Sequence, residues 1–313
     1  MQSSSLSPTS RLGPLRIGTR GSPLALAQAY EARDRLLAAH PDLNVEIIEI
    51  KTTGDKVQDR PLSEIGGKGL FSKELDAAQL ENRVDIGVHS MKDLETWLPD
   101  GIVLGAFLPR EDVRDALICP TASRLADLPE GAVVGTSSLR RQAQILAKRP
   151  DLKVVPFRGN VQTRLRKLAS GEADATLLAM AGLNRLSMED IAATALAPEE
   201  LLPAVAQGAI GITTRAGADD ILELLAPLND PDTAWRVTAE RAFLAELDGS
   251  CRTPIGGLAE AVGDQVRFRG LVARPDGSGM MSVERSGPLG DALALAIDAG
   301  KTLAADMDDS YRP

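Results

Sequence analysis

Residues 132–148 read AVVGTSSLRRQAQILAK, and the order of residue types in this stretch decides the fold class. Residues 132–135 have the composition of a short strand, and they run directly into three hydroxyl residues, Thr136-Ser137-Ser138. Serine and threonine are favoured helix N-caps, so a helix is expected from there to about Lys148. A strand that leads directly into a helix is the repeating unit of α/β proteins, so the stretch predicts a sheet covered by helices.

The same alternation extends in both directions along the chain. We expect strands at 15–18, 45–50, 84–88, 102–108, 116–119, 153–157, 175–180 and 209–213, and helices at 23–40, 70–80 and 161–169. This pattern is typical of α/β architecture with mainly parallel strand pairing. The last third differs, with a helix at 232–247, three consecutive strands at 258–262, 265–273 and 279–285, and a helix at 289–307. It predicts a small α+β domain that begins near residue 229.

Composition excludes several classes of protein. The 313 residues are 43% hydrophobic and 25% charged, which suffices for two or three globular domains, and no apolar run is long enough to span a membrane. The net charge of −9 and the aromatic fraction of 3% argue against nucleic-acid binding. Two cysteines cannot form a disulfide framework, and the two histidines give no metal-ligand spacing.

The first residues carry no secretory signal. Residues 1–11 are rich in serine and proline and predict a disordered tail, because they contain no apolar run of their own. Their serine content and Arg11 are only a weak match to an organelle transit peptide. The cytoplasm is therefore the expected location.

One basic cluster stands out against the acidic background. Residues 135–170 contain nine lysines and arginines against Asp151 alone. Arg140 and Arg141 fall in the first turn of the expected helix, where the helix dipole disfavours cations unless an anion is also present. Arg158 ends a strand next to a helix start, where ligands of α/β proteins usually bind. We therefore expect an anionic-ligand site here, with Lys148, Arg149, Arg166 and Lys167 on the surface.

Two further residues leave alternatives open. Cys251 lies in a polar, glycine-bracketed loop beside Arg252, where a thiol is either a reactive nucleophile or a structural residue. Cys119 ends an apolar strand and is expected to be buried. Asp93 follows an expected strand and is either a turn or cap residue or a carboxylate that acts in acid–base or electrostatic catalysis.

Eight segments together resemble the porphobilinogen deaminase (hydroxymethylbilane synthase) family. They are RIGTRGSPLA (16–25), GGKGLF (66–71), VHSMKD (88–93), GTSSLRRQ (135–142), RGNV (158–161), AGLNRL (181–186), PAVAQGA (203–209) and DGSCRTPIGG (248–257). The resemblance extends in one order from about residue 15 to the C-terminus.

The resemblance implies a fold of three domains. Two are α/β domains like type II periplasmic binding proteins, between which the chain crosses twice, and the third is a small α+β domain that carries the cofactor cysteine. On this sequence the first would comprise residues 12–108 and 209–228, the second 109–208 and the third 229–313.

The resemblance also implies an activity. The family joins four porphobilinogen units head to tail, with release of ammonia, into linear hydroxymethylbilane for tetrapyrrole (haem) biosynthesis. It works on a dipyrromethane cofactor made from the substrate and held by a thioether to one cysteine. No metal is implied, and we expect a monomer with a small-molecule substrate and without nucleic-acid or membrane partners.

Residue by residue, Asp93 matches the catalytic aspartate and Cys251 the cofactor cysteine. The remaining cofactor-binding matches are Ser90, Lys92, Thr136, Ser138, Arg140 and Arg158. The substrate-binding matches are Arg20, Ser22, Lys68, Arg141, Arg164 and Arg185. Guanidinium groups suit the two carboxylates of each pyrrole.

Two positions depart from the family pattern. Glu64 stands where the family often has a basic residue, and Asn184 replaces a residue that is commonly lysine, so only Lys68 remains basic in the glycine loop. Two rival interpretations are a non-catalytic anion-binding protein of the periplasmic-binding fold and a nucleic-acid-binding module that uses residues 140–167. The first of these does not account for Cys251 in a third domain.

Overall fold

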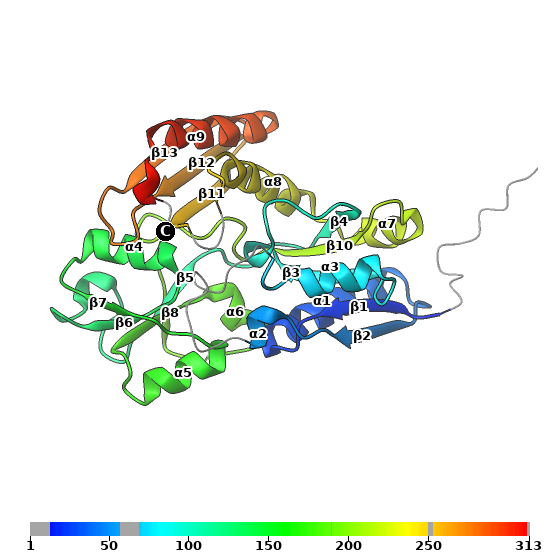
Figure 1. Cartoon of the computed structure of the whole chain (residues 1–313), viewed down its shortest axis with the longest axis horizontal. Coiled ribbons are helices and arrows are strands. Elements are labelled where there is room, and N and C mark those ends of the chain that lie inside the picture. Colours follow the sequence, from blue (N-terminus) through cyan, green and yellow to red (C-terminus); the bar gives the residue numbers. More distant parts are fainter. Residues whose placement is uncertain (1–12, 57–68, 189, 250–252, 312–313) are drawn as a thin grey trace, which may run out of the picture. The chain divides into compact units, whose positions relative to one another are not determined.

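The computed structural model describes residues 13–56, 69–188, 190–249 and 253–311 (Figure 1). The expected N-terminal tail, residues 1–11, therefore lies outside the described residues. The described chain divides into two compact units. Among the described residues, unit 1 comprises 13–56, 69–109 and 209–234, and unit 2 comprises those within 110–208 and 235–311.

Unit 1 contains a five-stranded sheet with the strand order β2-β1-β3-β10-β4. The strands are β1 (Leu15–Thr19), β2 (Val45–Glu49), β3 (Ile86–Ser90), β4 (Ile102–Phe107) and β10 (Ile210–Arg215). The helices are α1 (Pro23–Ala39), α2 (Thr53–Lys56), α3 (Lys73–Leu80) and α7 (Asp219–Leu225). Fully buried aliphatic side chains such as Ile17, Leu36 and Ile212 form the core between the sheet and helices α1 and α7.

Unit 2 contains a second five-stranded sheet, with the order β7-β6-β8-β5-β9. Its strands are β5 (Asp115–Ile118), β6 (Val133–Gly135), β7 (Lys153–Val155), β8 (Ala175–Ala179) and β9 (Ala193–Ala195). Its helices are α4 (Leu139–Lys148), α5 (Val161–Ala169) and α6 (Met180–Arg185). Helix α4 begins as expected, because the Ser138 side chain caps it by accepting a hydrogen bond from the Arg141 backbone N–H at 3.4 Å.

The expectation of mainly parallel pairing is wrong. In unit 1, β1 is parallel to β2 and β3, but β10 is antiparallel to β3 and β4. In unit 2, β6 is parallel to β7 and β8, but β5 is antiparallel to β8 and β9. The two antiparallel strands are the first strands after each passage between units, so no crossover helix requires them to be parallel to their neighbours.

The last part of the chain forms a separate antiparallel sheet, with the order β11-β12-β13. Its strands are β11 (Ile255–Val262), β12 (Gln265–Val272) and β13 (Met281–Pro288), and helices α8 (Pro231–Glu246) and α9 (Ala292–Asp306) accompany it. Helix α9 packs on β12 and β13 (Figure 1). The two α/β sheets have equivalent strand orders, the chain crosses between them twice, and a small α+β part follows. These features confirm the expected fold class. The division into three domains with the stated bounds stays a prediction.

Several boundaries differ from the expected ones. Helix α3 begins at Lys73 rather than at residue 70, after a turn in which Gly69 has a φ of +74°. The short elements α6, α7 and β9 were not expected, because three to seven residues give too little periodicity to identify. No helix within the described residues is long and apolar enough to cross a membrane.

Within unit 2, one buried carboxylate joins segments that are distant in the sequence. Glu240 of α8 is 0% exposed, and its two oxygens accept hydrogen bonds from Arg110 at 2.7 and 2.9 Å. The backbone N–H groups of Ala206 and Ala259 donate to the same carboxylate at 2.6 and 2.9 Å. Arg110 is the first residue of unit 2 after the first crossover, and Ala206 lies just before the second.

Glu240→Gln should lower the free energy of unfolding by about 3–5 kcal/mol, because it leaves the buried Arg110 guanidinium without a counter-ion. Glu284→Gln is the matched control, since Glu284 also accepts two hydrogen bonds from one arginine, Arg267, but at an exposed position. The control substitution should lower the free energy of unfolding by about 1 kcal/mol or less. Urea unfolding of both variants checks this, and equal losses would contradict it.

Candidate active site

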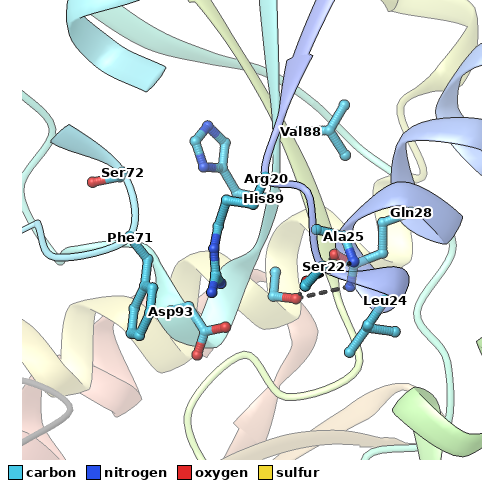
Figure 2. A pocket seen from close by; sticks show the side chains of 11 residues that line it. Arg20, Ser22, Leu24, Ala25, Gln28, Phe71, Ser72, Val88, His89 and Asp93 are labelled. Atoms are coloured by element: carbon cyan, nitrogen blue, oxygen red, sulfur yellow. Dashed lines mark hydrogen bonds between the residues drawn. The ribbon is translucent and has the colours of Figure 1, made fainter. Parts of the chain in front are cut away.

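A pocket in unit 1 collects several of the residues expected to be functional. It lies where β1 and β3, parallel neighbours, end beside the N-terminus of α1. Its lining consists of Arg20, Ser22, Leu24, Ala25, Gln28, Phe71, Ser72, Val88, His89, Ser90 and Asp93 (Figure 2). The carboxyl ends of parallel strands are the usual ligand site of α/β sheets. The pocket is a hollow of about 50 Å³ that opens to solvent.

Asp93 is the last residue of the short 3₁₀ turn Met91–Asp93, which follows β3 directly. Its side chain is exposed within the pocket lining, and it does not cap a helix. Arg20 follows β1, and its guanidinium group lies 4.2 Å from the centre of the Phe71 ring. Figure 2 shows the Arg20 and Asp93 side chains directed into the same space. The pocket thus offers one anionic and one cationic group to a ligand.

The hydroxyl groups of the pocket are held by neighbouring residues. Ser22 caps α1 by accepting a hydrogen bond from the Ala25 backbone N–H at 3.3 Å, as its position before Pro23 predicts. Ser90 and Gln28 exchange hydrogen bonds, with the Gln28 amide donating at 2.8 Å (Figure 2). Lys92, half-buried in the same turn as Asp93, does not line the pocket.

His89 is a packed residue rather than an exposed base. It is 7% exposed, and its Nε2 lies 2.9 Å from the Thr213 hydroxyl. The Thr213 hydroxyl donates to Gln79 Oε1 at 2.9 Å, while the Gln79 amide donates to the Thr213 carbonyl at 2.8 Å. Thr213 therefore accepts from His89 Nε2–H. His40, the other histidine, is the C-cap residue of α1, as expected.

In unit 2, Arg140 and Arg141 meet a carboxylate that the sequence analysis missed. Both side chains are buried, and both bind Asp115, the first residue of β5, at 2.7 Å. Burial alone would raise the pKa of Asp115, but the two guanidinium groups outweigh it and hold that pKa well below its usual range. Asp115 is thus the anion that makes two cations tolerable in the first turn of α4. The only feature of the sequence that could have indicated this partner was an aspartate at the start of a buried strand.

The other expected residues of unit 2 lie on loops and helix ends beside the second sheet. The Thr136 hydroxyl accepts a hydrogen bond from the Ser138 backbone N–H at 3.2 Å, so this cluster organises its own turn. The half-buried Arg164 side chain donates to the Gly159 carbonyl at 2.9 Å, and Arg185 donates to the Gly208 carbonyl at 3.0 Å. Arg158 is half-buried at the end of the loop that follows β7.

The basic residues expected on the surface have partners of their own. Lys148 donates to the Glu199 and Glu200 carbonyls, and Arg149 binds Asp151 at 2.6 Å. Arg166 is exposed. Lys68 and Cys251 lie outside the described residues, whereas Cys119 is 8% exposed, which confirms its expected burial. Across the described ranges, no group of three histidine, cysteine, aspartate or glutamate residues is placed to hold a metal ion.

Comparison with known families decides the family of the chain. Residues 15–223 match "Porphobilinogen deaminase, dipyromethane cofactor binding domain", and residues 234–309 match "Porphobilinogen deaminase, C-terminal domain". The chain belongs to the porphobilinogen deaminase family. The resemblance stated from the eight sequence segments is confirmed, as are the transferase activity and the dipyrromethane cofactor that it implies.

Individual porphobilinogen deaminases resemble the chain over most of its length. That of Paracoccus denitrificans is 59% identical, covering 93% of this chain and 93% of the relative. The chloroplastic enzyme of Oryza sativa subsp. japonica is 57% identical, covering 95% and 85%. Among solved structures, the periplasmic VFT2 domain of Bordetella pertussis BvgS is 14% identical with a TM-score of 0.40, covering 71% of this chain and 87% of that one.

The residues present fit a dipyrromethane group. Each of its two pyrroles carries two carboxylates, so its site needs buried or half-buried cations with donors to spare. Arg140 Nε is such a donor, because it is buried and has no hydrogen-bond partner among the described residues. Asp115, Arg140 and Arg141 together carry one surplus positive charge.

One buried carboxylate of the porphobilinogen deaminase fold lies close behind the pocket of unit 1. Asp76, in the first turn of α3, is 7% exposed, and Asp76 Oδ1 has no partner among the described residues. Burial raises the pKa of Asp76 to about 6, although a hydrogen bond with Ser72 opposes the rise. The unfolded value is about 3.9. The native state thus binds the extra proton between pH 4 and 6, and stability falls as the pH rises through that window.

Asp76→Asn should therefore stabilise the protein at pH 7.5 by up to about 3 kcal/mol, because it removes a buried charge, and should gain almost nothing at pH 4. Glu81→Gln, at the exposed end of the same helix, is the control and should show no such pH dependence. Thermal melts of the three proteins across this range check the prediction. A gain that is equal at pH 4 and pH 7.5 would contradict it.

Proposed function

We propose that the chain joins four porphobilinogen molecules head to tail, with loss of ammonia from each, into linear hydroxymethylbilane for tetrapyrrole (haem) biosynthesis. The observation that carries the proposal is the pocket of unit 1, in which the exposed Asp93 carboxylate and the Arg20 guanidinium group share one space. A substrate with a cationic reaction centre and two carboxylates needs both charges.

Asp93 is the catalytic residue of this proposal. Loss of ammonia from the aminomethyl group of porphobilinogen leaves positive charge spread over the pyrrole ring and its nitrogen. A fixed carboxylate stabilises that charge by accepting the pyrrole N–H, and it can take up the proton released when the new carbon–carbon bond forms. Because the short turn that ends at Asp93 follows β3 directly, Asp93 is held by the sheet. Its charge is therefore in place before the reaction begins.

Arginines and hydroxyl groups bind the substrate carboxylates. In the proposal, this role belongs to Arg20, Ser22, Lys68, Arg141, Arg164 and Arg185. A guanidinium group is permanently charged and donates two parallel hydrogen bonds to a carboxylate, which orients a pyrrole as well as holding it. The contact of Arg20 with the Phe71 ring limits its freedom, so less entropy is lost when it binds.

The dipyrromethane group supplies the pyrrole carbon to which the first substrate is joined. In the proposal Cys251 holds it by a thioether, with Ser90, Lys92, Thr136, Ser138, Arg140 and Arg158 as its polar partners. Covalent attachment would keep the growing chain bound to the protein through every cycle, which would make each addition a local reaction.

We further propose that the chain acts as a monomer in the cytoplasm, on a small-molecule substrate and without nucleic-acid or membrane partners. Its acidic net charge of −9 supports the exclusion of nucleic acid as a partner.

Cys251→Ser should abolish the covalent adduct and leave almost no activity, because serine is a far weaker nucleophile than cysteine toward the substrate-derived group. Cys119→Ser is the control and should retain the adduct, since Cys119 is buried in the core of unit 2. Intact mass spectrometry of both proteins checks this. An adduct on Cys119, or none on the wild-type protein, would sink the proposal.

Asp93→Asn should fold, keep its dipyrromethane and turn over roughly 10²–10³-fold more slowly, because one preorganised charge is lost. Asp93→Glu keeps the charge and should retain more activity than the asparagine variant. Asp100→Asn, an exposed carboxylate outside the pocket, is the control and should leave turnover unchanged. Single-turnover kinetics and thermal melts separate the possibilities. Near-normal turnover with a lowered melting temperature would show that Asp93 is only structural.

A further inference from the structure

The carboxylate of Asp115 is the centre of the most deeply buried charge cluster in unit 2. Asp115 is 0% exposed, and Arg140 and Arg141 are each 5% exposed. Asp115 Oδ2 accepts from Arg140 at 2.7 Å. Asp115 Oδ1 accepts from Arg141 Nε and NH2 at 3.2 and 2.7 Å, and from the Gln207 side-chain amide at 3.0 Å. Both carboxylate oxygens are therefore used.

Each guanidinium group is also held at a second point. Arg140 NH1 donates to the Leu202 carbonyl at 2.7 Å, and Arg141 NH1 donates to the Leu177 carbonyl at 2.8 Å. With contacts both to Asp115 and to a backbone carbonyl, neither planar group can rotate freely. One buried nitrogen of the pair, Arg140 Nε, has no hydrogen-bond partner among the described residues.

The framework around the cluster limits how far it can move. Asp115 lies in β5, which is paired with β8 on one side and β9 on the other. Helix α4 is covered by the turn between β12 and β13: the Gln142 side chain donates to the Pro275 carbonyl at 3.1 Å. A Cβ atom on Gly277 would lie 2.6 Å from the Ala147 nitrogen, so this turn is tightly packed on α4. The strand and the helix thus hold the carboxylate and the arginines at a fixed separation.

The charges within the cluster do not balance. Two guanidinium groups and one carboxylate leave one buried positive charge, which is costly when it has no counter-ion. Burial, opposed by Asp115 and reinforced by Arg141, lowers the pKa of Arg140. Glu240 and Arg110, in contrast, pair one carboxylate with one guanidinium group. The surplus charge and the unused donor call for a second anion.

We propose that Asp115 is a positioning residue, which fixes the Arg140 and Arg141 guanidinium groups so that they can receive a carboxylate of the pyrrole chain. The inference rests on the proposed function and deepens it, because it names the residue that organises the arginines. Asp115 itself does not touch the ligand. Its carboxylate sets the direction of both groups before the ligand arrives, so binding needs little rearrangement.

The test measures how fast the cofactor assembles. Apo-protein, made in cells that cannot produce porphobilinogen, would be mixed with porphobilinogen, and the two-pyrrole adduct would be followed by intact mass spectrometry. Asp115→Glu keeps the charge but displaces it by one methylene, so assembly should be roughly 10–100-fold slower although the protein folds. Asp151→Glu is the matched control, because Asp151 binds Arg149 near the other end of α4. The control variant should acquire the two-pyrrole adduct at the wild-type rate.

A second pair of variants tests the inference if Asp115→Glu fails to fold. The single variant Arg141→Gln leaves Arg140 paired with Asp115. The double variant, Arg141→Gln with Asp115→Asn, leaves Arg140 without its carboxylate. It also restores the surplus positive charge of the wild-type cluster. If Asp115 positions Arg140, the double variant should load about tenfold more slowly than the single variant in folded protein. Equal loading by these two variants, or wild-type loading by Asp115→Glu, would overturn the inference. A wild-type protein that acquires no adduct would instead overturn the proposed function.

Discussion

The buried carboxylate of Glu240 is the interaction on which much of unit 2 depends. It accepts hydrogen bonds from Arg110, Ala206 and Ala259, which belong to the first crossover, the segment before the second crossover and the first strand of the C-terminal sheet. A chain that leaves a unit and returns needs the two passages fixed, because neither is held by a helix of its own. One carboxylate does this for three segments, at the cost of desolvating an ion pair.

The two buried carboxylates of unit 2 illustrate different uses of the same chemistry. Glu240 meets one guanidinium group and backbone donors, so its charge is balanced and its contribution is to the packing of the chain. Asp115 meets two guanidinium groups, so its cluster remains positive. A stable core has no need of that excess, whereas a site for a ligand with several carboxylates does. The stoichiometry of the Asp115 cluster therefore supports the proposed binding role of Arg140 and Arg141.

The sequence predicted elements wherever a long pattern or a cap marked them. Helix α5 has the expected bounds, and the N-caps Ser22 and Ser138 are used as expected. The direction of β5 and β10 was not predictable, because it depends on where the chain re-enters each sheet and not on local composition. Asp115 was missed for a similar reason. The excess of cations in residues 135–170 predicted an anion, but only the folded chain brings a residue twenty positions before that segment into contact with it.

The position of Asp93 differs from that of the buried carboxylates in a way that its proposed chemistry requires. A carboxylate that stabilises a passing positive charge must stay accessible to the substrate, yet its position must not depend on the substrate. Asp93 meets both conditions, because its side chain is exposed while its turn follows a strand paired with β1 and β10. Behind that strand, the hydrogen bonds among His89, Thr213 and Gln79 join β3 and β10 to α3. The rigidity of the site thus comes from the sheet and the polar network behind it, which leaves the carboxylate itself uncommitted.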